Sequence, residues 1–188
     1  MDSFVDIYVQ HNPEIPDIVV LNSVFETLHR TLSAAKMTGV GISFPDAAAD
    51  RNNLGSRLRL HGSNAALSDL MTRKWLVSML DYVSVSSVTP VPIGTHQHRC
   101  VSRVQVKSSP ERLRRRMMKR HNVDESTAVA RIPDGGGKIL SLPFLQITST
   151  STKQRFKLFI QQGPLMEEQV LGCFNSYGLS KQATIPWF

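Results

Sequence analysis

The sequence predicts an α+β protein whose first half follows the order strand, helix, strand, strand, helix, strand. Residues 4–9 alternate apolar and polar side chains, as a half-buried strand does. Residues 17–35 place apolar side chains at helical spacing, and the segment RLRLH at 57–61 alternates again. Helices and strands in such an order pack as helices against a sheet.

The first expected helix covers residues 17–35 and follows a turn marked by Pro13 and Pro16. Its apolar residues recur three and four positions apart, so they form one stripe that faces a core. The members of this stripe are Leu21, Val24, Phe25, Leu28 and Leu32.

Two more strands and a second helix complete the first half. The segment GVGISFP at 39–45 is typical of a short buried strand, and RLRLH follows it. Ser63 or Asn64 can cap a helix that we expect to reach about Leu80, before YVSVSSV at 82–88 alternates as a last strand. This order is that of the ferredoxin-like fold, which is frequent among RNA-binding modules.

A domain boundary is expected at residues 89–94, where TPVPIG combines two prolines and a glycine. The prediction is a ferredoxin-like domain at 1–94 and a smaller α+β domain at 95–188 that carries an arginine-rich helix. The elements expected in the second domain are a strand at 98–107, helices at about 110–120 and 124–131, strands at 144–148 and 155–162 joined by a turn, then a final strand and, after it, a tail at 176–188.

Composition excludes several classes of protein. Cys100 and Cys173 lack the spacing of a zinc site or a disulfide framework. Residues 1–10 are acidic and alternating, unlike a signal peptide, and no stretch approaches the ~18 apolar residues of a membrane span. We therefore expect a soluble, cytoplasmic protein. The segment GGGK at 135–138 lacks the first glycine and the Ser or Thr of a phosphate-binding loop, so an ordinary loop is expected there.

The net charge of +7 is concentrated in one segment. Residues 99–121 hold nine Lys or Arg and one acidic residue, so the rest of the chain is close to neutral. Ser109, Pro110 and Glu111 are typical of a helix start, with a capping hydroxyl, a first-turn proline and an acid at the positive end of the dipole. At ~100° per residue, five cations then share an arc of roughly 140°. These are Arg112, Arg115, Arg116, Lys119 and Arg120.

Most charge runs are simply solvated faces. Like charges three and four positions apart, however, destabilise a helix by ~0.2–0.5 kcal/mol per pair, and an acidic partner would offset that cost. Arginine favours bidentate contacts with phosphate, the commonest polyanion in cells. We therefore expect nucleic acid as the partner, ahead of a membrane surface, a groove on a protein, or solvation alone.

Over essentially its whole length the chain resembles the CRISPR-associated endoribonuclease of type I-F systems, which processes the precursor of CRISPR RNA. The order and spacing of many short segments carry the resemblance. They are GVGISFP, RLRLH, VSRVQVKSSPERLRRRMMKRH, RIPD, LPF, S-x-S-T-x-x-x-F at 149–156, KLFI, GPL, YGLSK and the final PWF.

The resemblance implies cleavage at the 3′ base of a repeat hairpin, without metal or other cofactor, by attack of the RNA's own 2′-OH, leaving a 2′,3′-cyclic phosphate. It also implies that the enzyme stays on the mature guide RNA as a subunit of a surveillance complex. The alternative is a subunit of the same ancestry that caps the guide RNA hairpin without cutting it.

The catalytic residues that the resemblance implies are His29, Ser149, Ser151 and Tyr177. His29 corresponds to the catalytic histidine, Ser149 to the serine that positions the 2′-OH, Ser151 to a hydroxyl at the scissile phosphate, and Tyr177 to the tyrosine that orients the histidine. By pattern alone, His29 beside the apolar stripe would be a partly buried structural histidine, and the Ser/Thr run an ordinary turn.

The RNA-binding residues follow from the same resemblance. Arg103 and Gln105 correspond to the residues that read the lower stem, and Phe156 to the aromatic that stacks on its terminal base pair, although a strand residue facing the core remains the alternative for Phe156. The helix with Arg112, Arg115, Arg116, Lys119 and Arg120 would enter the major groove of the stem. Lys119 departs from the family, where arginine is usual.

Overall fold

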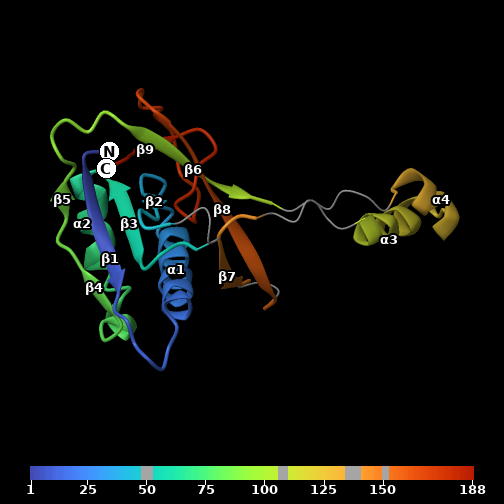
Figure 1. Cartoon of the computed structure of the whole chain (residues 1–188), viewed down its shortest axis with the longest axis horizontal. Coiled ribbons are helices and arrows are strands. Elements are labelled where there is room, and N and C mark those ends of the chain that lie inside the picture. Colours follow the sequence, from blue (N-terminus) through green and yellow to red (C-terminus); the bar gives the residue numbers. More distant parts are fainter. Residues whose placement is uncertain (48–52, 106–109, 134–140, 150–152) are drawn as a thin grey trace. The chain divides into compact units, whose positions relative to one another are not determined.

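The computed structural model describes residues 1–47, 53–105, 110–133, 141–149 and 153–188, and Figure 1 labels its helices and strands. Contacts between residues divide them into two compact units, one of residues 1–104 with 142–188 and one of residues 105–141. The first unit contains two antiparallel sheets and two α-helices, and the second contains two more α-helices. The protein is therefore mixed α+β, as the sequence predicts.

The first sheet is built around the N-terminal strand. Its strands are β1 (Ser3–Val9), β2 (Gly41–Ser43), β3 (Arg57–Gly62), β4 (Val83–Val85) and β5 (Thr89–Pro90). Their order is β2-β3-β1-β4, every pairing is antiparallel, and the short β5 also pairs with β1. The strands expected in the first half of the chain are therefore present, with β1 and β3 at the centre of the sheet.

The second sheet is formed by the later part of the chain. Its strands are β6 (His98–Val104), β7 (Phe144–Thr148), β8 (Arg155–Met166) and β9 (Thr184–Pro186). Their order is β7-β8-β6-β9, which leaves β7 at one edge. The final strand, β9, lies inside the expected tail.

The expected boundary at residue 94 falls between the two sheets. The compact units divide instead at residues 104 and 141, so both sheets belong to one unit. The division into domains at 1–94 and 95–188 stays a prediction.

Helix α1 (Asp17–Ala34) is the element that positions the candidate site. The five residues of its predicted stripe are fully buried. The helix contacts β1 of the first sheet and β7 of the second, and Figure 1 shows it between these strands. Because its apolar stripe is fixed in the core, the residues beside that stripe are held at defined positions near the edge of β7.

Helix α2 (Asn64–Thr72) is shorter than predicted. The sequence predicted a helix to about Leu80, because Trp75 and Met79 continue the apolar spacing. The helix ends earlier because Lys74 has a φ of 51°, in the left-handed region, and only a short 3₁₀ turn at Val77–Met79 follows. Trp75 is buried although it lies in a turn. An apolar residue at helical spacing therefore did not indicate a helix here. The predicted cap is correct, since Ser63 accepts a hydrogen bond from the backbone N–H of Ala66.

No helix in the parts of the chain that the structure describes is long and apolar enough to cross a membrane.

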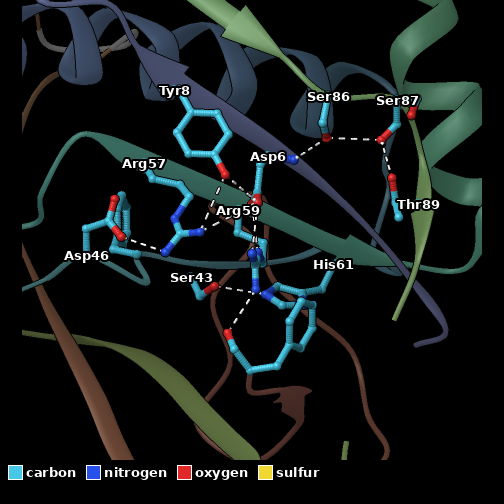
Figure 2. A network of polar contacts seen from close by, with 12 residues as sticks. Asp6, Tyr8, Ser43, Asp46, Arg57, Arg59, His61, Ser86, Ser87 and Thr89 are labelled. Carbon is cyan, nitrogen blue, oxygen red and sulfur yellow. Dashed lines mark hydrogen bonds and ion pairs between the residues drawn. The ribbon is translucent and has the colours of Figure 1, made fainter. Parts of the chain in front are cut away.

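A buried ion pair joins the central strands of the first sheet (Figure 2). Asp6 on β1 and Arg59 on β3 lie opposite each other, and the guanidinium donates two hydrogen bonds, of 2.7 and 2.8 Å, to the two carboxylate oxygens. Arg59 also donates to the main-chain oxygen of Phe188 at 3.0 Å, and its guanidinium contacts the rings of Phe4 and Phe188. Burying two charges is costly unless the pair is well aligned and its remaining hydrogen-bonding groups are satisfied, as they are here.

His61 lies in the same buried network. Its Nε2 is 2.8 Å from the hydroxyl oxygen of Ser43, and the residue is fully buried. Burial disfavours the charged imidazolium and lowers the pKa of His61 to about 3, and the positive charge of Arg59 acts in the same direction. The ring is therefore neutral in the folded protein at pH 7.

This burial predicts a pH-dependent stability. An unfolded chain binds a proton at His61 below about pH 6.5, whereas the folded chain does so only near pH 3. The stability that comes from keeping His61 neutral is therefore complete above pH 6.5 and is lost as the pH falls toward 3, by up to roughly 1 kcal/mol per pH unit. Denaturant unfolding at pH 7, 6, 5 and 4 should show a steeper loss for the wild type than for His61→Gln. Parallel curves for the two proteins would contradict the prediction.

Candidate functional site

His29 is held by a turn that lies 147 positions further along the chain. Its Nδ1 is 2.8 Å from the main-chain carbonyl oxygen of Ser176. A carbonyl oxygen can only accept a hydrogen bond, so Nδ1 carries the proton of the neutral ring. The other ring nitrogen, Nε2, is then unprotonated and able to accept a proton. One backbone contact thus defines which nitrogen is available for chemistry.

Tyr177 stacks on the histidine. The two ring centroids are 4.0 Å apart with an angle of 11° between the planes, and Tyr177 is also parallel to Phe25 at 6.2 Å. Phe25 and His29 are four positions apart on α1, so they lie on one face of the helix and a single flat ring can contact both. The fully buried Phe25 thereby anchors Tyr177, and Tyr177 limits how the imidazole can rotate.

The turn at 175–179 is built to present these groups. The Asn175 side chain accepts hydrogen bonds from the backbone N–H groups of Tyr177 and Leu179, and Gly178 donates to the carbonyl oxygen of Asn175. Gly178 has a φ of 70°, and a Cβ added there would lie 2.6 Å from Ile42 Cγ2. The turn therefore requires glycine for its backbone angle and for its close approach to β2.

Ser149 lies at the other side of the candidate site, directly after β7. It lines a pocket of about 170 Å³ together with Glu26, His29, Arg30, Thr148 and Lys153. The Ser149 backbone N–H donates to the carbonyl oxygen of Gln154, and the Ser149 carbonyl oxygen accepts from the backbone N–H of Lys153. The structure thus brings His29 and Ser149, which the resemblance pairs, into one pocket, and their catalytic roles stay predictions. Ser151, the fourth predicted catalytic residue, lies outside the described residues.

Arg103 and Phe156 extend this surface from the neighbouring strands. The guanidinium carbon of Arg103, on β6, is 5.4 Å from the centroid of the Phe156 ring and 5.9 Å from that of Tyr177. Phe156, on β8, is half-buried and packs partly against the core. The ring thus packs partly inward, as the core-facing alternative expects, and also contacts Arg103 by a cation–π interaction. Its stacking on a base pair stays a prediction.

The second compact unit carries the basic helix. Helix α3 (Pro110–His121) is present as predicted, and it packs against α4 (Glu125–Arg131). Arg114, which is outside the predicted cationic face, is half-buried and donates a 2.8 Å hydrogen bond to the carbonyl oxygen of Ile132. The five cations of the predicted face are all exposed: Arg112, Arg115, Arg116, Lys119 and Arg120. Gln105, at the start of this unit, is exposed as well.

Comparison with known proteins identifies the family. The model of the family described as "CRISPR-associated protein (Cas_Csy4)" matches residues 4–188. The chain belongs to the Cas_Csy4 family.

Two curated relatives of this Cas_Csy4 protein are named "CRISPR-associated endonuclease Cas6/Csy4". The one from Pseudomonas aeruginosa (strain UCBPP-PA14) is 44% identical over 188 residues, and the one from Escherichia coli (strain UTI89 / UPEC) is 45% identical over 188 residues. Both matches cover 100% of this chain and 100% of the relative. A solved structure described as "An RAMP protein binding different RNA substrates" is 13% identical, with a TM-score of 0.33, and the match covers 98% of this chain and 99% of that chain.

Some parts of this Cas_Csy4 site could not be predicted from sequence. The carbonyl oxygen of Ser176 contributes through the backbone, so its residue type carries no signal. Glu26 lines the same pocket, but a glutamate on a helix is usually only a solvated charge. Its position three residues before His29, on the same face of the predicted helix, is the one feature that could have indicated it.

Proposed function

We propose that the protein is an endoribonuclease that cleaves CRISPR precursor RNA at the 3′ base of the repeat hairpin. The observation that carries this proposal is the pocket that His29 and Ser149 line together, with Nδ1 of His29 held by the carbonyl oxygen of Ser176. Membership of the Cas_Csy4 family and relatives named as endonucleases support the same activity.

The proposed reaction uses the 2′-OH of the RNA as nucleophile. Nε2 of His29 takes the 2′-OH proton, the 2′ oxygen attacks the adjacent phosphorus, and the bond from phosphorus to the 5′ oxygen of the next nucleotide breaks. The products are a 2′,3′-cyclic phosphate and a strand with a 5′-OH, whose oxygen takes up a proton. Because the nucleophile belongs to the substrate and an imidazole titrates near neutrality, the reaction requires positioning and proton transfer and no metal ion.

The neighbouring groups have distinct proposed roles. The Ser149 hydroxyl positions the attacking 2′-OH, and Ser151 contacts the scissile phosphate. Tyr177 orients the imidazole by stacking, and the carbonyl oxygen of Ser176 keeps the Nδ1 proton in place. Arg103 binds the base of the stem in this proposal, which its contacts with the rings of Phe156 and Tyr177 support.

The cations of α3 are proposed to bind the hairpin itself. An A-form major groove is deep and narrow, so the helix would contact mainly phosphates there, and base reading would fall to Arg103 and Gln105 at the open end of the stem. These contacts do not involve the bond that is cut. They would persist after cleavage and keep the protein on the mature guide RNA as a subunit of a larger complex.

The first sheet supports a further part of the proposal. Its antiparallel order β2-β3-β1-β4, with α1 between β1 and β2 and α2 between β3 and β4 in the chain, matches the ferredoxin-like arrangement. We propose this fold for residues 1–94.

The proposed chemistry predicts that His29→Ala abolishes cleavage and retains binding. Losing the base should reduce the single-turnover rate by at least about 10²-fold, because general-base catalysis contributes on the order of 10²–10⁴-fold. The measurement is cleavage of a labelled repeat hairpin from the chain's own CRISPR locus, beside the dissociation constant for a 2′-deoxy version that cannot react.

The matched control is His11→Ala, which replaces an exposed histidine outside the pocket. This variant should cleave the hairpin as the wild type does. A wild-type protein that binds the hairpin tightly without cutting it would instead indicate the non-cleaving cap subunit. Loss of both binding and cleavage in His29→Ala would make His29 a structural residue.

The proposed role of α3 predicts a salt-dependent affinity. If five cations contact phosphates, the logarithm of the binding constant should fall with the logarithm of salt concentration at a slope of roughly −3.5 to −4.5. Replacing Arg115 and Arg116 by Ala should make the slope shallower by about 1.4 to 1.8. The control is Lys74→Gln with Lys181→Gln, which removes two exposed charges in the other compact unit. The proposal would be contradicted if the Arg115 and Arg116 variant kept the wild-type slope. It would also be contradicted if the Lys74 and Lys181 variant changed the slope by the same amount.

A further inference from the structure

The edge of β7 is closed by two side chains of α1. The backbone N–H of Gln146 donates to the side-chain oxygen of Asn22 at 3.0 Å, and the backbone N–H of Thr148 donates to the Glu26 carboxylate. Both N–H groups therefore point away from β8, whose antiparallel pairing with β7 uses the N–H groups of alternate residues. Without α1, this edge would present unpaired donors.

The spacing of the two hydrogen bonds matches the two elements. Asn22 and Glu26 are four residues apart, which is about 6.0 Å along a helix, and Gln146 and Thr148 are two residues apart, which is about 6.8 Å along a strand. Helix and strand run in the same direction here, so a slip along either would break both bonds together. The pair therefore fixes the register of α1 against β7.

That register leads directly into the candidate site. One helical turn beyond Glu26 is His29, and one residue beyond Thr148 is Ser149. Glu26, His29, Thr148 and Ser149 line the same pocket. The hydrogen bond from the Thr148 N–H to Glu26 thus joins the helix and the strand directly before His29 and Ser149.

We infer that Asn22 and Glu26 are positioning residues, which set the distance between His29 and Ser149 by holding α1 in register with the edge of β7. The inference rests on the proposed function of His29 and Ser149. Neither Asn22 nor Glu26 needs to touch RNA for this role. Glu26 acts as a hydrogen-bond acceptor, so an uncharged acceptor of the same length can replace it.

The pair Glu26→Ala and Glu26→Gln tests this role. Glutamine retains an oxygen that accepts from Thr148, and alanine does not, although alanine is the best helix former and should not weaken α1 itself. A misplacement of about 1 Å can reduce a rate on the order of 10²-fold. We therefore expect Glu26→Ala to cleave the hairpin about ten- to a hundred-fold more slowly in single turnover, and Glu26→Gln to stay within about threefold of the wild type.

Binding of the 2′-deoxy hairpin separates positioning from a structural effect. Its dissociation constant should be the same for the wild type and both Glu26 variants, because the α3 unit is unchanged. Ser33→Ala, at an exposed position near the end of the same helix, is the control and should behave as the wild type in both assays. Asn22→Ala and Asn22→Asp form a second pair, in which Asp retains the acceptor and should cleave faster than Ala.

The outcomes distinguish failure of this inference from failure of the proposed function. The inference is overturned if Glu26→Ala cleaves at the wild-type rate, if Glu26→Gln is slowed as much as Glu26→Ala, or if the Ala variant binds the hairpin more weakly. In each of these cases an inactive His29→Ala would leave the proposed function standing. A His29→Ala variant that cleaves normally would overturn both.

Discussion

The hydrogen bond from His29 Nδ1 to the carbonyl oxygen of Ser176 is the contact on which the candidate site depends. It joins a helix near the start of the chain to a turn near its end and determines which ring nitrogen is unprotonated. The stacking of Tyr177 on His29 and the cation–π contact between Arg103 and Tyr177 involve the same turn. The chemistry therefore rests on a backbone atom, whose position depends on how the two sheets pack.

Two other sets of contacts join separate elements of the same compact unit. The buried pair of Asp6 and Arg59 joins the centre of the first sheet, and Arg59 also binds Phe188, just beyond a strand of the second sheet. At the other end, Asn22 and Glu26 close the edge of β7. In both places, polar groups of a strand form hydrogen bonds with residues of another element. The hydrogen bonds that these groups need therefore also fix the elements around the site.

Much of this arrangement could be predicted from sequence. The apolar stripe of α1, the bounds of β7 and the start of α3 follow from local patterns that the fold does not override. The end of α2 was mispredicted because Lys74 adopts a left-handed conformation while Trp75 remains buried. The meeting of His29 with Ser149 required the resemblance to a family. The contacts of Ser176 and Glu26 could not be predicted from sequence. Ser176 contributes its main-chain carbonyl oxygen, and Glu26 binds the edge of β7, which exists only in the folded protein.

The most direct test is incubation of the protein with a labelled repeat hairpin in excess EDTA, beside the same RNA with a 2′-deoxy sugar just 5′ of the expected cut. The account predicts that the first RNA is cut to a 2′,3′-cyclic phosphate and that the second is bound equally well and left intact. Cleavage that requires added Mg²⁺, or cleavage of the 2′-deoxy RNA, would contradict attack by the 2′-OH with His29 as base. Tight binding of both RNAs with no cleavage of either would contradict the proposed activity itself.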